Sequence, residues 1–228
     1  MLFLHALPFN GSMWAGQSGL LPGSSYMPTL YPFGDSVSAW AAAVLHDVKE
    51  ERLVVVGCSV GGSCALEVAA LAPDRVAALV LIGTKAKHQP EPAVFSSALE
   101  LLERQGMEAA WQAVWAPLFS KSASASVIHA AKQVFLQQSA EEIFRGIKAF
   151  HTRESRDDIL KSLHKPITVI TGAEDVAPDP AVSLAQADVA VSGRLETVSH
   201  CGHYVPLEKP DALNAILRGI IAEQAALL

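Results

Sequence analysis

Short runs of apolar residues alternate with amphipathic stretches along most of the chain. The unbroken runs at 53–57 and 76–83 predict buried strands, because aliphatic residues without a polar interruption suit a strand that is covered on both faces. Asp35 or Ser36 is a suitable cap for the helix that follows them, and Asp211 for the C-terminal helix. By the same patterns we predict further strands at 2–6, 28–32, 165–172 and 194–198, and helices at 37–48, 61–71 and 211–221. Strands that alternate with helices in this way predict a parallel sheet with helices on both faces.

The alternation of strand and helix patterns stops in the stretch 84–163, which contains no strand pattern. This stretch shows only helical periodicity, broken by glycines and prolines, and it is rich in aromatic residues. We therefore predict a core domain formed by 1–83 and 164–228, with a helical cap, 84–163, inserted between two strands. Most aromatic side chains of the cap are expected to pack it onto itself and onto the core, but one or two should line a cleft. The candidates for substrate contact are Trp111, Trp115, Phe119 and Phe144.

The clearest chemical signal is Gly57-Cys58-Ser59-Val60-Gly61, which stands between a predicted strand and a predicted helix. In a Gly-x-Ser-x-Gly turn of this kind the serine hydroxyl is presented above the sheet, and the glycines let strand and helix approach closely. The N–H of Val60 would lie at the helix N-terminus, where negative charge is stabilised. Ser59 is therefore a candidate nucleophile, and an inert serine in a tight turn is the alternative.

Composition and charge narrow the classes of function. Half of the 228 residues are hydrophobic and 18% are charged, which is typical of a globular protein with a full core. The formal net charge of -6, without long runs of Lys or Arg, argues against nucleic acid or an anionic membrane as partners. No apolar run is long enough to cross a bilayer, and the N-terminal residues lack the basic segment of a signal peptide, so we expect a soluble cytoplasmic protein.

The three cysteines are Cys58, Cys64 and Cys201. Their odd number and the lack of a CxxC pair argue against a disulfide framework or a zinc site. We expect Cys58 and Cys64 to be buried packing residues beside the serine turn, with a reactive thiol as the less favoured alternative.

With the Ser59 turn in place, the chain resembles the α/β-hydrolases over almost its whole length. In that family a serine, an acid and a histidine follow one another along the sequence and form a catalytic triad. The segment Ile-Thr-Gly-Ala-Glu-Asp-Val-Ala-Pro (170–178) is similar to the family's acid turn, which implies Asp175 as the acid. Cys-Gly-His followed by Leu-Glu-Lys-Pro is similar to its histidine loop, which implies His203 as the base. Competing candidates are Glu174 and Asp179 for the acid and His200 for the base.

The first predicted strand and the loop after it resemble the His-Gly loop of the same family, written here His5-Ala6. The resemblance implies that His5 is structural and that the N–H of Leu7 joins that of Val60 in an oxyanion hole. Alanine in place of the glycine is a departure from the family pattern. Larger members begin with an antiparallel strand pair ahead of this loop, so we expect a reduced sheet of about six parallel strands without that edge.

The resemblance implies a carboxylic-ester hydrolase for small apolar esters or lactones, similar to small esterases and 3-oxoadipate enol-lactonases. Such an enzyme forms an acyl-enzyme on its serine and needs no cofactor or metal. Thioesterase, C–C bond hydrolase and perhydrolase activities use the same triad, and a ligand-binding or signalling protein with slow turnover is the alternative from another class. The expected partner is a small-molecule ester or lactone, and the chain is expected to be a monomer or a homodimer.

Overall fold

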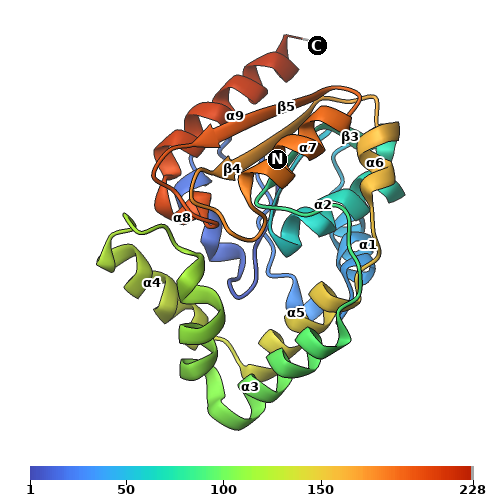
Figure 1. The fold of residues 1–228 in the computed structure, drawn as a ribbon. Coiled ribbons are helices and arrows are strands. Elements are labelled where there is room, and N and C mark those ends of the chain that lie inside the picture. The colour runs from blue at the N-terminus through green and yellow to red at the C-terminus, as the bar shows by residue number, and fades with distance from the viewer. Residues whose placement is uncertain (227–228) are drawn as a thin grey trace.

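A five-stranded parallel sheet lies at the centre of the structure, a computed structural model that describes residues 1–226 (Figure 1). Neighbouring strands end nearly level with one another, since Gly57 pairs with Leu4 and Ile82 pairs with both Cys58 and Ile170. The segments that follow the strands therefore meet at one edge of the sheet, where ligands bind in open α/β folds. The strands, side by side in this order, are β1 (Leu2–Leu4), β2 (Leu53–Cys58), β3 (Val76–Ile82), β4 (Ile167–Gly172) and β5 (Gly193–Val198).

The predicted parallel sheet is confirmed, but it has five strands where about six were expected. The strand predicted at 28–32 is wrong, and a single bridge between Leu2 and Tyr26 continues the sheet at this edge. The two prolines of the 28–32 stretch have no N–H group to donate to a neighbouring strand. The N–H of Leu30 donates to Nε2 of His5 at 2.9 Å instead. A polar side chain of the adjoining loop thus takes the hydrogen bond that a sixth strand would need.

Helices cover both faces of the sheet, as predicted (Figure 1). One face carries α1 (Val37–Asp47), α2 (Val60–Leu71), α6 (Asp157–Ser162) and α7 (Pro180–Val189), and the other carries η1 (Gly11–Gln17) and α9 (Pro210–Ala225). The short elements η2 (Tyr31–Phe33), η3 (Pro73–Arg75) and α8 (Val205–Glu208) connect them. The Ser36 side chain caps α1 by accepting the N–H of Ala39 at 3.2 Å, whereas α9 begins at Pro210 and leaves Asp211 inside its first turn.

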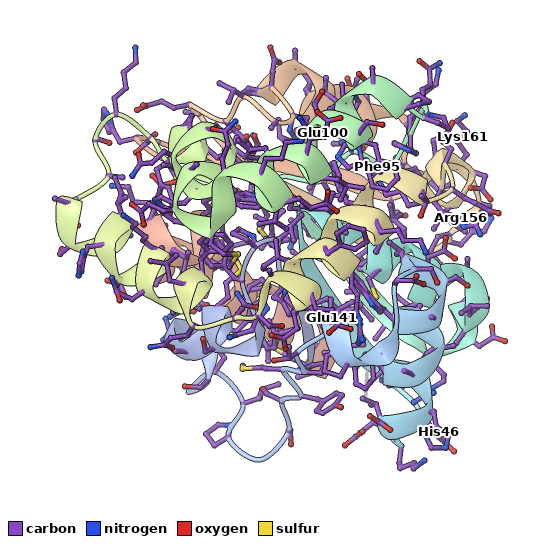
Figure 2. All side chains as sticks on the ribbon, turned by 90° about the horizontal axis from the view of Figure 1, so that it is seen from below. His46, Phe95, Glu100, Glu141, Arg156 and Lys161 are labelled. Carbon is purple, nitrogen blue, oxygen red and sulfur yellow. The ribbon has the colours of Figure 1, made fainter. Side chains whose placement is uncertain are left out.

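The segment between β3 and β4 is helical, and its described residues contain no strand, as predicted. Figure 1 shows α3, α4 and α5 below the sheet, and Figure 2, the view from below, shows α3 and α5 side by side with Glu100 and Glu141 on them. A separate cap domain spanning 84–163 stays a prediction. The last helix of this stretch, α6, packs against α2 and α7 beside the sheet. The other elements are α3 (Pro92–Ala110), η4 (Trp111–Trp115), η5 (Ala116–Leu118), α4 (Ala125–Leu136) and α5 (Ala140–Thr152).

The contact between β1 and the first turn of α2 yields a prediction about stability. A Cβ atom at Gly61 would lie 2.1 Å from the carbonyl oxygen of Leu4 and 2.5 Å from that of His5. We expect Gly61→Ala to lower the free energy of unfolding by about 1–3 kcal/mol, because backbone atoms must move apart to admit the methyl group. Urea denaturation measures this change.

Gly219→Ala is the matched control, because nothing lies within 4 Å of a Cβ at that position in α9. Alanine in a helix interior should raise the free energy of unfolding by about 0.5–1 kcal/mol. Wild-type stability of Gly61→Ala would mean that the approach of β1 to α2 imposes no constraint.

Candidate active site

Ser59 occupies a sharp turn between β2 and α2, and its backbone is strained. Its φ of 55° and ψ of -121° lie where residues with a side chain are rare. The conformation is held from both sides, because Ser59 N–H donates to the carbonyl of Ile82 at 2.8 Å and the Thr84 hydroxyl donates to the carbonyl of Ser59 at 3.2 Å. The Ser59 hydroxyl makes no capping bond to α2, so it is left available above the sheet.

Glycines allow the turn to form. A Cβ at Gly57 would lie 2.3 Å from the carbonyl oxygen of Gly61, and one at Gly62 would lie 1.8 Å from Oγ1 of Thr84. Such distances leave no room for a side chain, so the sequence around Ser59 is fixed by the close approach of strand and helix.

His203 and Asp175 form a buried pair at the same edge of the sheet. Nδ1 of His203 lies 3.0 Å from Oδ2 and 3.1 Å from Oδ1 of Asp175, and the two residues are 2% and 3% exposed. Nδ1 therefore carries the proton that faces the carboxylate, which leaves Nε2 free to accept a proton. The N–H of Ala177 donates to Oδ1 of Asp175 at 2.8 Å and holds the carboxylate in place.

Gly83, at the end of β3, brings the pair next to the serine turn. It has a φ of +53°, and a Cβ here would lie 2.9 Å from Cε1 and Nδ1 of His203 and 3.0 Å from Oδ2 of Asp175. Gly83 directly follows Ile82, whose carbonyl holds the N–H of Ser59. The hydrogen bonds found within residues 1–226 do not include one from the Ser59 hydroxyl to His203. Sequence reasoning missed Gly83, and the only available signal was a glycine at the end of an apolar strand.

The competing acids are engaged elsewhere, and the competing base is exposed. The Glu174 carboxylate accepts the N–H of Lys121 at 3.0 Å, and Asp179 caps α7 by accepting the N–H of Ala181 at 2.6 Å. His200 is exposed and has a φ of 52°. Of the five titratable candidates, the geometry thus joins only the two that the family pattern implies.

The candidate oxyanion donors, the N–H groups of Leu7 and Val60, come from β1's loop and the first residue of α2. Neither N–H donates to a partner among the hydrogen bonds of the described residues. The contact of Gly61 with the carbonyls of residues 4–5 shows that this loop runs beside the N-terminus of α2. The roles of both groups remain a prediction.

The histidine loop is tied to the helical segment by a glutamate that sequence reasoning did not single out. Glu208 accepts the N–H of Gly202 at 3.1 Å with one carboxylate oxygen and the N–H of Ser120 at 3.1 Å with the other. The N–H of His203 itself donates to the carbonyl of Leu118 at 2.9 Å. The end of η5 and the residues just after it therefore support the loop that carries the imidazole.

The aromatic side chains proposed for substrate contact pack together between the helical segment and the core. Trp111 and Trp115 are 1% and 4% exposed, and both lie against the ring of Phe135 with centroids 5.7 and 4.9 Å away. Phe119 lies 4.9 Å from the ring of Tyr204. Phe144 is partly buried against the core. Their contact with substrate stays a prediction, since none of the four lines the cavity at Ser59.

That cavity has a volume of about 640 Å³, and Ser59 and Gly83, which directly follow β2 and β3, form part of its wall. Its other walls come from the stretches 85–94 and 176–182 and from the end of α5 at 150–153. Segments distant in the sequence therefore line one cavity that reaches Ser59, and the charged residues among them were not anticipated.

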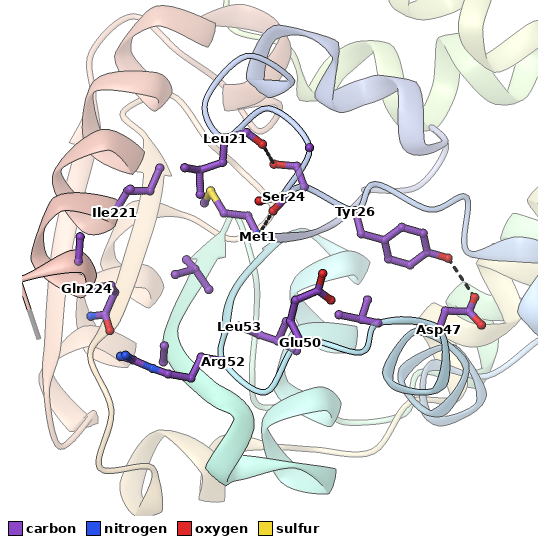
Figure 3. Close-up of a pocket in the computed structure, with 16 residues that line it drawn as sticks. Met1, Leu21, Ser24, Tyr26, Asp47, Glu50, Arg52, Leu53, Ile221 and Gln224 are labelled. Atoms are coloured by element: carbon purple, nitrogen blue, oxygen red, sulfur yellow. Dashed lines mark hydrogen bonds between the residues drawn. The ribbon is translucent and has the colours of Figure 1, made fainter. Parts of the chain in front are cut away.

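A larger cavity, of about 700 Å³, lies at the opposite end of the strands (Figure 3). Met1 and Leu53, at the starts of β1 and β2, line it together with Tyr26, whose hydroxyl donates to Asp47 at 3.0 Å. It contains none of the strained, paired or buried titratable groups described above, so size alone does not identify the site.

Cys58 and Cys64 are buried in the core. Burial raises the pKa of the Cys58 and Cys64 thiols, which are therefore protonated at neutral pH and suited to packing, as expected. Residues 1–226 contain no group of three or more His, Cys, Asp or Glu side chains that could hold a metal ion. No helix in this range is both long and apolar enough to cross a membrane.

Comparison with known proteins gives a consistent result. A model of the alpha/beta hydrolase family matches residues 1–216. The chain is 26% identical over 247 residues to the lipase LipV of Mycobacterium tuberculosis, covering 96% of this chain and 91% of that protein. It is similar in structure to a thermophilic esterase from Thermogutta terrifontis, with a TM-score of 0.88, 22% identity, and coverage of 98% and 89%. An enol-lactonase from Burkholderia xenovorans gives a TM-score of 0.83, 22% identity, and coverage of 97% and 90%. At such identities the structural likenesses show the fold.

The buried His5 at the start of the loop yields a prediction about pH. Burial lowers its pKa to about 4, and the hydrogen bond between Nδ1 and the carbonyl of Ala6, 3.1 Å long, only partly offsets this shift. The neutral ring accepts the N–H of Leu30 at Nε2. Below about pH 6.5 His5 binds a proton in the unfolded chain but stays neutral in the folded chain until the pH approaches 4. Stability should therefore fall as the pH falls from about 6.5 to about 4, by up to about 3 kcal/mol from this residue.

Urea unfolding of the wild type and of His5→Gln between pH 7 and pH 4 measures the effect. The glutamine variant should lose this part of the acid sensitivity, whereas His164→Gln, at an exposed position, should keep it. An unchanged pH slope in His5→Gln would show that His5 is not held neutral in the folded protein.

Proposed function

The chain belongs to the alpha/beta hydrolase family, and from this premise we propose that it is a carboxylic-ester hydrolase for small, largely apolar esters or lactones. The observation that carries the proposal is the buried His203–Asp175 pair, held against Gly83 directly beside the strained Ser59 turn. A serine with its hydroxyl free, an imidazole base and an orienting carboxylate are the parts that nucleophilic catalysis on an acyl group requires.

In the proposed mechanism Nε2 of His203 accepts the proton of the Ser59 hydroxyl as its oxygen attacks the carbonyl carbon. Asp175 keeps the other ring nitrogen protonated and stabilises the imidazolium that forms. The N–H groups of Leu7 and Val60 donate to the oxyanion of the tetrahedral intermediate, and the N-terminus of α2 adds its dipole.

Collapse of this intermediate breaks the ester bond, and the imidazolium gives its proton to the departing alkoxide. The acyl group is then bonded to the Ser59 oxygen. His203 next deprotonates a water molecule that attacks the acyl carbon, and the carboxylate product leaves with the serine restored. The Ser59–His203 hydrogen bond is expected to form with substrate bound, because such contacts often tighten only in the reacting complex.

The serine is tested by Ser59→Ala. With p-nitrophenyl acetate as substrate, kcat should fall by about 10⁶, or to the background rate, because no nucleophile remains. Ser63→Ala, at a neighbouring serine of the same cavity, should stay within about tenfold of the wild type. A wild type that binds an ester tightly without turning it over would instead favour the ligand-binding function.

The acid is tested by comparing two carboxylates of one loop. Asp175→Asn should lower kcat by about 10⁴, because the amide cannot hold the required tautomer of His203. Asp179→Asn should keep wild-type kcat, since Asp179 caps α7 and asparagine also caps helices. The reverse outcome would reassign the acid to Asp179.

A further inference from the structure

Arg153, at the end of α5, is a buried cation in the wall of the Ser59 cavity. The residue is 8% exposed and lines this cavity together with Phe150 and His151. Its guanidinium carbon lies 4.0 Å above the centre of the Phe150 ring. The charge thus sits on an aromatic surface inside the cavity and not in bulk water.

The Arg153 guanidinium has no carboxylate partner among the described residues. Its Nη1 donates to the carbonyl of Phe150, and its Nε has no hydrogen-bond partner. Burial without a partner lowers its pKa to about 10, so it remains a cation at neutral pH. Arg156, three residues later, shows the usual arrangement, with salt bridges of 2.9 Å to both Glu67 and Glu154. A buried charge that lacks such a partner is costly, and the cost is relieved when an anion binds.

The rest of the lining does not neutralise this cation. Lys85 and Lys87 stand with Arg153 against two carboxylates, Glu91 and Asp179, so the lining has one more positive than negative charge. Burial and the nearby Arg153 lower the pKa of His88 and His151, which keeps both rings uncharged at neutral pH. The cavity is therefore cationic in a protein whose formal net charge is -6.

We propose that Arg153 is a specificity-determining residue that binds a carboxylate of the substrate, so that the preferred esters or lactones carry a free acid group. This inference rests on the proposed hydrolytic function of the same cavity. An arginine can hold a carboxylate through two parallel N–H donors, and Arg153 lines the cavity. A monoanion matches a single buried cation, whereas a phosphate dianion would bring more charge than the lining offsets.

The occupant would then have three parts. Its ester carbonyl lies at Ser59 and its carboxylate at Arg153. Its apolar portion contacts Val94, Val176 and Val182, valines that line the cavity yet are 36% exposed or more. Half-esters of medium-length dicarboxylic acids have this composition.

The test compares the monomethyl ester of adipic acid with methyl adipamate, its neutral isostere with a primary amide in place of the carboxylate. Wild-type kcat/KM should favour the half-ester by about 10- to 100-fold, the range expected for hydrogen bonds to a charged group. In Arg153→Gln this preference should fall to about onefold, and Arg153→Lys should keep part of it, because lysine retains the charge without the planar fork.

Arg145→Gln is the matched control, since Arg145 lies on the same helix and pairs with Glu141 at the surface. It should keep the full preference. If Arg153 served only to cap the carbonyl of Phe150 at the end of α5, Arg153→Gln would lose stability and retain the preference. We expect instead that the variant unfolds at the same or a higher urea concentration, because it removes an unpaired buried charge.

A binding experiment separates this inference from the proposed reaction. In Ser59→Ala, hexanoate should raise the melting temperature more than hexanamide, and Arg153→Gln in the same background should abolish the difference. Selective hexanoate binding in a protein that hydrolyses no ester would leave the anion site standing and overturn the hydrolytic function. Ester hydrolysis with no preference for the half-ester would overturn the anion site alone. Stronger stabilisation by methyl phosphate than by hexanoate would overturn the choice of a carboxylate.

Discussion

The structure depends on the absence of side chains where β1 and β2 meet the first turn of α2. Gly57 and Gly61 have no space for a Cβ, because the carbonyl groups of α2 and β1 already occupy the positions that the added atoms would take. Only this approach allows α2 to begin directly after β2, with Ser59 forced into a conformation that is otherwise unfavourable. The strain is local, and the packing of the whole sheet maintains it.

The lack of a side chain at a glycine also makes room for the histidine. Gly83 lets the end of β3 pass within contact distance of the His203 ring and the Asp175 carboxylate, so the pair is fixed against backbone and not against mobile side chains. Glu208 then supports the loop from the far side through the N–H of Gly202. Ser59, His203 and Asp175, from three distant parts of the chain, can thus be held in a small volume without long flexible contacts.

The central features of this arrangement could be predicted from the sequence because they have local causes. The apolar runs at 53–57 and 76–83 indicated buried strands, and the glycines around Ser59 indicated a tight turn. The 28–32 stretch was misjudged because the decisive partner of the Leu30 N–H is the side chain of His5, which only the tertiary structure brings near. The importance of a glycine after a strand or of a glutamate after a histidine loop likewise depends on neighbours far away in the chain.

The double role of Glu208 limits how the molecule can admit a reactant. One carboxylate connects the backbone of Ser120, ahead of α4, to the backbone next to His203, so the two cannot separate without breaking partly buried hydrogen bonds. An outward movement of α4 would therefore also displace the backbone next to His203. Passage to and from Ser59 is accordingly expected beside the stretch 85–94, which lines the cavity on the other flank. The hydrogen bonds of this stretch found within residues 1–226 run to Gln186 and to residues 151–156, and not to the histidine loop.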